Sequence, residues 1–319
     1  MKHCVLLIAG LLLLPAFYAF AAEPPHLGFV YPAGGRQGSV LEVEVGGKAI
    51  KNASGVIVNG SDVYAVILPE EILAPFGEVS GESKETFKKR EKVFQDKKAK
   101  KNRRNDPFPE TLLLRIAILD RAEPGERELR LITPGGLSNR VAFRVGTLTE
   151  AQELEPNNRK DQANEVKSLP AVLNGQILAG DTDCFKIPGK KGQLLTLKAE
   201  ARSLKPFMAD AVPGWFQASM ALYDSKGAEL CHSDNFLFNQ EPLLFYEVPE
   251  NGDYTVEIRD SIYRGREDFV YRIAVGELSY ITRCFPLGAQ AGSTAVVSIY
   301  GKNLDRQTTE VNTESVSLP

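Results

Sequence analysis

The sequence predicts an all-β protein built from tandem antiparallel β-sandwiches, with one charged insertion that is either helical or disordered. Three observations support this prediction. Short segments alternate apolar and polar residues with a period of two, as half-buried strands do. Turn-forming Gly, Pro, Asn and Asp residues separate these segments at close, regular spacing. The 319 residues leave room for two or three domains, and 43% hydrophobic and 25% charged residues are typical of a globular protein.

The N-terminal segment is expected to be a signal peptide over residues 1–22. Lys2 precedes the apolar run Val5–Leu14, and Ala19–Ala21 offers a small-x-small cleavage site. An uncleaved membrane anchor is the alternative, but the apolar core is short for a span and Pro15 interrupts it. We therefore expect an exported protein that is periplasmic, in the cell envelope or extracellular, with no transmembrane span after cleavage.

Three cysteines remain after the signal peptide, namely Cys184, Cys231 and Cys284. Their number is odd and none has metal-ligand spacing. A disulfide between Cys184 and Cys231 is one interpretation, and the other is that these side chains are small buried hydrophobes.

The first sandwich is predicted over residues 23–147. In Val40–Val45, Leu41, Val43 and Val45 point to one face and the two glutamates point to the other, which indicates a half-buried strand. Asn59-Gly60 predicts a hairpin turn between Val56–Val58 and Val63–Val66. Further strands are expected at Leu112–Leu119, Arg127–Ile132 and Val141–Val145.

A basic insertion interrupts this sandwich at about residues 81–106. Lys84–Arg104 holds 11 Lys or Arg against 3 Asp or Glu, in a chain whose net charge is -3. The composition favours a charged surface helix or a partly disordered loop. It either contacts an anionic polymer or is a solvated insertion with no fixed partner. Export argues against nucleic acid as a partner.

The second sandwich is predicted over residues 148–277, where residues 150–159 act as a linker that also begins this domain. Leu195 and Leu197 alternate with polar neighbours. Turns are expected at Asp224–Gly227 and Glu250–Asp253. The expected strands are Leu194–Lys198, Met220–Tyr223, Leu244–Val248, Tyr254–Ile258 and Phe269–Val275.

Two polar clusters in this domain predict a calcium site. Their six oxygen-bearing side chains are Glu153, Glu155, Asn157, Asn158, Asp181 and Asp183. Calcium takes six to eight oxygen ligands from carboxylates, amides and carbonyls. Strand alternation would put Glu153, Glu155 and Asn157 on one side of an extended strand. Asp181 and Asp183 could do the same from a second strand, and Asn174-Gly175 predicts a turn between the clusters. The alternative is solvated glutamates, Asx turns and a capped loop.

These clusters also carry a resemblance. The string E-x-E-P-N-N at Glu153–Asn158, followed by G-D-x-D-x-F at Gly180–Phe185, resembles the bacterial pre-peptidase C-terminal domain. The strings L-Y-D-x-x-G at Leu222–Gly227 and N-G-D-Y-x-V-x-I-R-D at Asn251–Asp260 extend the resemblance over the whole block. That family is a small, jelly-roll-like β-sandwich found beside secreted proteases and in modular surface proteins. In the related collagen-binding domains of clostridial collagenases, the matching residues bind calcium, so the resemblance implies calcium here as well.

An internal repeat predicts a partial second copy of the first domain over residues 278–319, beginning near Tyr280. Pro32, Gly34, Gly38, Ser39, Val43 and Gly47 recur at one constant offset as Pro286, Gly288, Gly292, Ser293, Val297 and Gly301. Two or three strands are too few to bury a face by themselves. Either the chain is a fragment of a longer protein or the tail pairs with another sheet. Both copies resemble the IPT/TIG-type immunoglobulin-like modules that accompany pre-peptidase domains in large secreted planctomycete-like proteins.

Catalytic and cofactor-binding residues are not predicted. Outside the signal peptide only His26 and His232 are available for a Ser-His or Cys-His arrangement, and His232 is expected in a polar turn. Neither G-x-S-x-G nor H-E-x-x-H occurs. The glycines of Gly34–Gly38 do not open a helix, so they predict a turn and not a phosphate-binding loop.

The function expected from the sequence is therefore non-catalytic. We expect an exported modular protein whose calcium-stabilised sandwich serves adhesion, substrate targeting or spacing, with an extracellular or envelope protein or glycan as partner. The alternative is the N-terminal accessory region of a secreted peptidase or other hydrolase whose catalytic domain lies beyond Pro319.

Overall fold

A computed structural model describes residues 23–69, 107–205, 216–305 and 308–312. The described chain is all-β, which confirms the predicted fold class, and its only helical elements are the 3-10 turns η2 (Lys160–Gln162) and η3 (Arg202–Leu204). The predicted signal peptide lies outside the described residues, as does the basic insertion at about 81–106. Within the described ranges, no helix has the length and apolar character that a membrane span needs.

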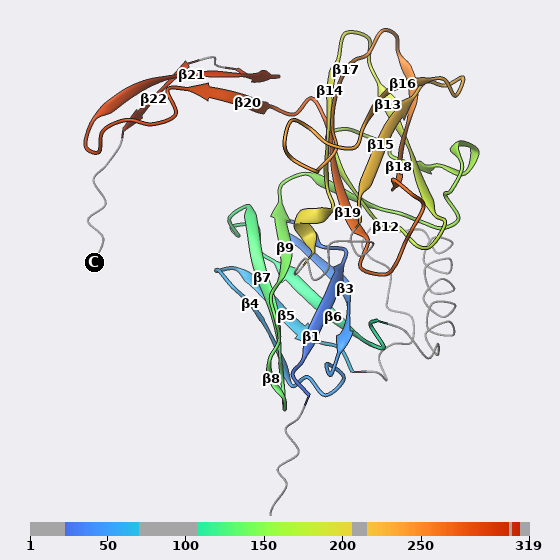
Figure 1. Ribbon diagram of the computed structural model, residues 1–319, viewed down its shortest axis with the longest axis vertical. Coiled ribbons are helices and arrows are strands. Elements are labelled where there is room, and N and C mark those ends of the chain that lie inside the picture. The colour runs from blue at the N-terminus through green and yellow to red at the C-terminus, as the bar shows by residue number, and fades with distance from the viewer. Residues whose placement is uncertain (1–22, 70–106, 206–215, 306–307, 313–319) are drawn as a thin grey trace, which may run out of the picture.

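The first sandwich packs two sheets, in the orders β1-β3-β6-β5 and β2-β9-β7-β4, with β8 beside β7 (Figure 1). The inward side chains of β3, Val43 and Val45, are fully buried, whereas Glu42 faces outward and pairs with Arg115 at 2.9 Å. The strands of this sandwich are β1 (His26–Tyr31), β2 (Gly34–Arg36), β3 (Ser39–Lys48), β4 (Gly55–Val58), β5 (Val63–Ile67), β6 (Glu110–Ile118), β7 (Gly125–Thr133), β8 (Gly136–Leu137) and β9 (Val141–Gly146).

The hairpin predicted at Asn59-Gly60 is wrong. β4 pairs with β7 in one sheet, and β5 pairs with β6 in the other. The turn therefore carries the chain from one layer of the sandwich to the other. Asn59 stabilises this crossing because its side-chain oxygen accepts the Glu128 N–H at 2.7 Å.

The second sandwich has five strands in each sheet, in the orders β10-β12-β19-β14-β17 and β11-β13-β18-β15-β16. Its strands are β10 (Thr149–Gln152), β11 (Asn164–Glu165), β12 (Ala171–Gln176), β13 (Thr182–Gly189), β14 (Leu194–Glu200), β15 (Ala218–Tyr223), β16 (Glu229–Ser233), β17 (Leu243–Glu247), β18 (Gly252–Asp260) and β19 (Val270–Gly276). Part of the predicted linker is thus β10, an edge strand that pairs in parallel with β12.

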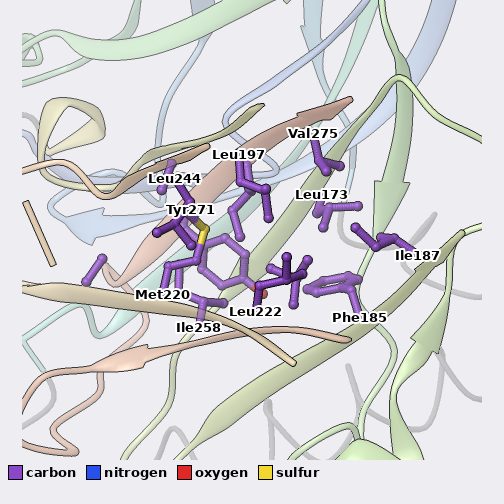
Figure 2. Close-up of a cluster of buried hydrophobic side chains, with 14 of the residues drawn as sticks. Leu173, Phe185, Ile187, Leu197, Met220, Leu222, Leu244, Ile258, Tyr271 and Val275 are labelled. Atoms are coloured by element: carbon purple, nitrogen blue, oxygen red, sulfur yellow. The ribbon is translucent and has the colours of Figure 1, made fainter. Parts of the chain in front are cut away.

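The core of the second sandwich lies between these two sheets (Figure 2). Leu195 and Leu197 are fully buried there, as their alternation predicts. Cys184, Cys231 and Cys284 are all free, so the structure has no Cys184–Cys231 disulfide.

A third apolar cluster joins the two sandwiches, because Leu204 of η3 and Val270 of β19 pack in it with residues of the first sandwich. Phe29 and Phe108 of the first sandwich meet edge to face with ring centroids 5.7 Å apart, and polar pairs such as Arg144–Glu200 at 3.2 Å flank the contact. The buried members of this interface cluster are Phe29, Tyr31, Ala33, Phe108, Leu204 and Val270.

Glu241 fixes the turn that brings Leu204 into the interface cluster. Its carboxylate accepts the backbone N–H groups of Ala201 at 3.0 Å, Arg202 at 3.3 Å and Ser203 at 2.8 Å. These groups follow the end of β14 at Glu200, and a carboxylate can serve all three because it offers two acceptor oxygens.

We expect Glu241→Gln to lower the free energy of unfolding by about 1–2 kcal/mol, because one acceptor oxygen is replaced by a donor that faces N–H groups. Urea denaturation measures this loss. Glu250→Gln, at an exposed position, is the matched control. Equal stability of the two variants would contradict the role given to Glu241.

The tail forms a three-stranded sheet of β20 (Tyr280–Phe285), β21 (Thr294–Lys302) and β22 (Thr308–Asn312), which extends to one side in Figure 1. Its β20–β21 pair repeats the β1–β3 pair, with the register irregularity at the equivalent residues: Leu27/Phe29 in β1 and Ile281/Arg283 in β20. Leu27 is 0% exposed, but its counterpart Ile281 is 54% exposed. The repeated sequence therefore folds with the same register and leaves its core face open.

Candidate metal centre

The loop that follows β10 carries the first predicted cluster. A strand does not align Glu153, Glu155 and Asn157 as predicted, because β10 ends at Gln152. The loop is held instead by Asn164, whose side chain accepts the Leu154 N–H at 2.8 Å and donates to the Leu154 carbonyl at 2.9 Å. This pair of bonds fixes the orientation of the Asn164 amide.

Three carboxylates converge from the two clusters. One oxygen each from Glu155, Asp181 and Asp183 lies within 4.8 Å of the others. Asp183 is on β13 and fully buried, Asp181 lies just before the strand, and Glu155 is partly exposed. We call these three residues the carboxylate cluster.

Asp181 is positioned by three donors. The Leu178 N–H at 3.1 Å and the Thr182 N–H at 3.0 Å reach its carboxylate, as does the Asn158 amide at 2.6 Å. Asn158 thus turns its Nδ2 toward Asp181 and positions that carboxylate.

The side-chain amide of Asn157 faces the carboxylate cluster. Its side chain is 0% exposed, and Nδ2 donates to Asn164 Oδ1 at 3.2 Å. Because Asn164 is fixed as an acceptor at that atom, Asn157 Oδ1 must face the other way. It lies 3.1 Å from Glu155 Oε2 and 3.2 Å from Asp183 Oδ1. With the amide turned over, its nitrogen would donate to both carboxylates, but two oxygens would then meet at Asn164.

Glu153 lies behind the carboxylate cluster, between two tyrosines. Its Oε1 accepts the Tyr31 hydroxyl at 3.0 Å and the Gln176 N–H at 2.9 Å. Tyr271 places its hydroxyl 3.5 Å from Glu153 Oε2 and donates to Asp183 Oδ2 at 2.6 Å. Sequence reasoning missed both tyrosines, because their hydroxyls reach the site only through tertiary packing.

The electrostatics of the site follow from burial and from like charges. Burial, together with the charges of Asp181 and Glu153, raises the pKa of Glu155 from 4.5 to about 7. Burial and the Glu153 charge also raise the pKa of Asp183 well above its ordinary value. Among the described residues, no basic group is a cause of either shift. Such a set of buried carboxylates needs a bound proton or a cation.

The turn predicted at Asn174-Gly175 is wrong, because both residues lie inside the buried strand β12. A side chain on Gly175 would overlap the Tyr271 hydroxyl and the Glu153 carboxylate. The Asn174 amide accepts from Arg272 at 2.8 Å and donates to Glu150 at 2.7 Å. Here Asn-Gly serves close packing and a buried polar pair, which its local turn preference cannot reveal.

The donor set suits a hard cation. Asn157 Oδ1 and the three carboxylates supply only oxygen, which calcium prefers, and water and a second carboxylate oxygen can complete six to eight ligands. Zinc and copper favour nitrogen and sulfur ligands. The residues present therefore fit calcium.

A Ser-His contact lies elsewhere on the second sandwich. His232 is on the strand β16, not in the polar turn that was expected, and its Nε2 is 2.9 Å from Ser219 Oγ. Ser219 is buried. In the described part of the chain, no carboxylate hydrogen-bonds His232, so the pair lacks the third group of a hydrolytic triad.

Comparisons with known proteins give no family. No family model matches the sequence, and comparison with curated proteins gives no match. Among solved structures, the chain is similar to the pre-peptidase C-terminal domain of a Bacillus anthracis collagenase, at 14% identity and TM-score 0.26 over 37% of this chain and 99% of that one.

Two further structures are similar at the same low level. The periplasmic lysozyme inhibitor PliG of Aeromonas hydrophila is 15% identical, with TM-score 0.25 over 40% of this chain and 96% of that one. The Bacteroides ovatus protein SGBP-B, solved with a mixed-linkage heptasaccharide, is 9% identical, with TM-score 0.21 over 76% of this chain and 71% of that one. These three TM-scores are far below 0.5, so the similarities indicate no function for this chain.

Proposed function

We propose that this protein is a non-catalytic, exported modular protein whose second sandwich binds calcium and acts in adhesion, substrate targeting or spacing. The observation that carries the proposal is the convergence of the Glu155, Asp181 and Asp183 carboxylates, which have one oxygen each within 4.8 Å of the others beside the buried Asn157 amide. A cation between these oxygens would turn three mutually repelling groups into ligands.

The ion would join two parts of the second sandwich. Glu155 and Asn157 come from the loop after β10, whereas Asp181 and Asp183 lie at the start of β13. Calcium would therefore hold the loop after β10, where the chain enters the second sandwich, against the start of β13. It would also stabilise the folded state by mass action. A rigid loop at the start of the second sandwich suits a module that holds its neighbours at a set spacing or presents a surface to an envelope protein or glycan.

Calcium titration calorimetry on the full chain tests the site. We expect saturable binding, and a thermal unfolding midpoint that rises when calcium replaces chelator. Asp183→Asn keeps the shape of the side chain and an acceptor for Tyr271 but removes a ligand charge, so affinity should fall about 10- to 100-fold.

Asp161→Asn is the matched control, because Asp161 is an exposed carboxylate on η2 that pairs with Arg159 at 2.7 Å and is not part of the carboxylate cluster. It should bind calcium like the wild type. The absence of both binding heat and a calcium-dependent midpoint in the wild type would overturn the proposal.

A further inference from the structure

The hydrogen bond between Tyr31 and Glu153 crosses from the first sandwich to the second. Tyr31 is the last residue of β1, and Glu153 follows β10, the edge strand of the second sandwich. Both side chains are buried, and the Tyr31 Oη to Glu153 Oε1 distance is 3.0 Å. A direct hydrogen bond to a buried carboxylate constrains geometry more than an exposed polar contact does, because water cannot readily take the place of either partner.

Glu153 connects this bond to the carboxylate cluster. Its second oxygen lies 3.5 Å from the Tyr271 hydroxyl, which in turn donates to Asp183 at 2.6 Å. Tyr271 is fully buried, and its hydroxyl packs so closely over Gly175 that a side chain there would overlap it. The hydroxyl therefore has little freedom to move. A shift of Glu153 is therefore transmitted through one rigid ring to a carboxylate of the cluster.

The apolar interface cluster surrounds the Tyr31 end of this connection. Phe29, Phe108 and Val270 pack with the Tyr31 ring in one buried group. Packing of the two sandwiches against each other therefore places the Tyr31 hydroxyl within hydrogen-bond distance of Glu153. Separation of the sandwiches would remove this donor from Glu153. Glu153 therefore links the two groups, because it accepts the Tyr31 hydroxyl of the interface cluster and lies beside the Tyr271 hydroxyl that is bonded to Asp183.

We propose that Tyr31 is a positioning residue that couples calcium binding to the docking of the two sandwiches through Glu153 and Tyr271. The inference rests on the calcium site proposed above and adds a partner from the other domain. Calcium orders Asp183 and with it the Tyr271–Glu153 pair, which favours the docked arrangement. By thermodynamic linkage, docking must favour calcium by the same factor.

The test uses the full chain with Tyr31→Phe, which keeps the packed ring and removes only the hydroxyl. We expect its calcium affinity by calorimetry to fall by about 5-fold or more, the lower end of typical coupling between sites. Tyr64→Phe is the matched control, since Tyr64 is 58% exposed on the same sandwich, and it should bind like the wild type.

Amide hydrogen exchange supplies the readout of docking. In the wild type, calcium should slow exchange in β1 and η3, the elements that bring Phe29, Tyr31 and Leu204 to the interface cluster. In Tyr31→Phe this calcium-dependent protection should shrink. Phe108→Leu, which loosens the interface cluster without touching Glu153, should also weaken calcium binding.

The outcomes separate the two proposals. A wild type that binds no calcium overturns the site itself. A wild type that binds calcium, with Tyr31→Phe and Phe108→Leu equally tight and interface exchange insensitive to calcium, overturns the coupling and leaves the site intact.

Discussion

Gly175→Ala is expected to lower the free energy of unfolding by about 3 kcal/mol, at the upper end of overpacking effects. The new methyl group would overlap the Tyr271 hydroxyl and the Glu153 carboxylate. Neither group can yield freely, because Tyr271 is fully buried and bonded to Asp183, and Glu153 is held by Tyr31 and Gln176. Thermal and urea denaturation of the full chain measure the loss.

Gly252→Ala on β18 is the matched control, because a methyl group there meets no atom within 4 Å. It should leave stability nearly unchanged. If Gly175→Ala were as stable as Gly252→Ala, the close packing of Tyr271 and Glu153 over Gly175 would be refuted.

The metal-free protein is expected to lose stability as the pH rises from about 4.5 to about 7. The pKa of Glu155 is raised from 4.5 to about 7 in the folded state, so the folded protein holds this proton more tightly than the unfolded chain does. The stabilisation is present below the lower value and is lost as pH passes the higher one. The loss is about 2 kcal/mol for Glu155 after allowance for solvent screening, and the raised pKa of Asp183 adds in the same direction.

Urea denaturation in chelator at pH 5 and pH 7.5 measures this loss, and the same pair of measurements in saturating calcium provides the comparison. If calcium binds at the carboxylate cluster, the ion replaces the protons and the loss should be absent. A metal-free protein whose stability is level or rises over this range would contradict the assignment of raised pKa values to the site.

Much of the fold can be predicted from the sequence because strand alternation is local. Leu195 and Leu197 alternate with polar residues on β14, and Val43 and Val45 do the same on β3. The pairing of strands is not local. Nothing near Asn59-Gly60 shows that β4 and β5 join different sheets, since that depends on β7 and β6, which come later in the chain.

The candidate site was predictable in its residue types but not in their arrangement. Two tight clusters of oxygen-bearing side chains indicated Glu155, Asp181 and Asp183. The position of Glu153 behind them depends on Tyr31, which is 122 residues away in sequence. The orientation of Asn157 depends on Asn164, which belongs to no motif and matters only because its amide is fixed by hydrogen bonds to Leu154.

The repeated register of β1–β3 in β20–β21 has a consequence for how the chain folds. By register alone, β20 could pair with β3 as well as with β21. Pairing β20 with β3 closes a loop roughly thirty times longer than the β1–β3 connection, which costs about 3 kcal/mol more in chain entropy. The N-terminal pair is also synthesised first and can close before β20 exists. Proximity along the chain and order of synthesis therefore keep the duplicated strands with their own partners.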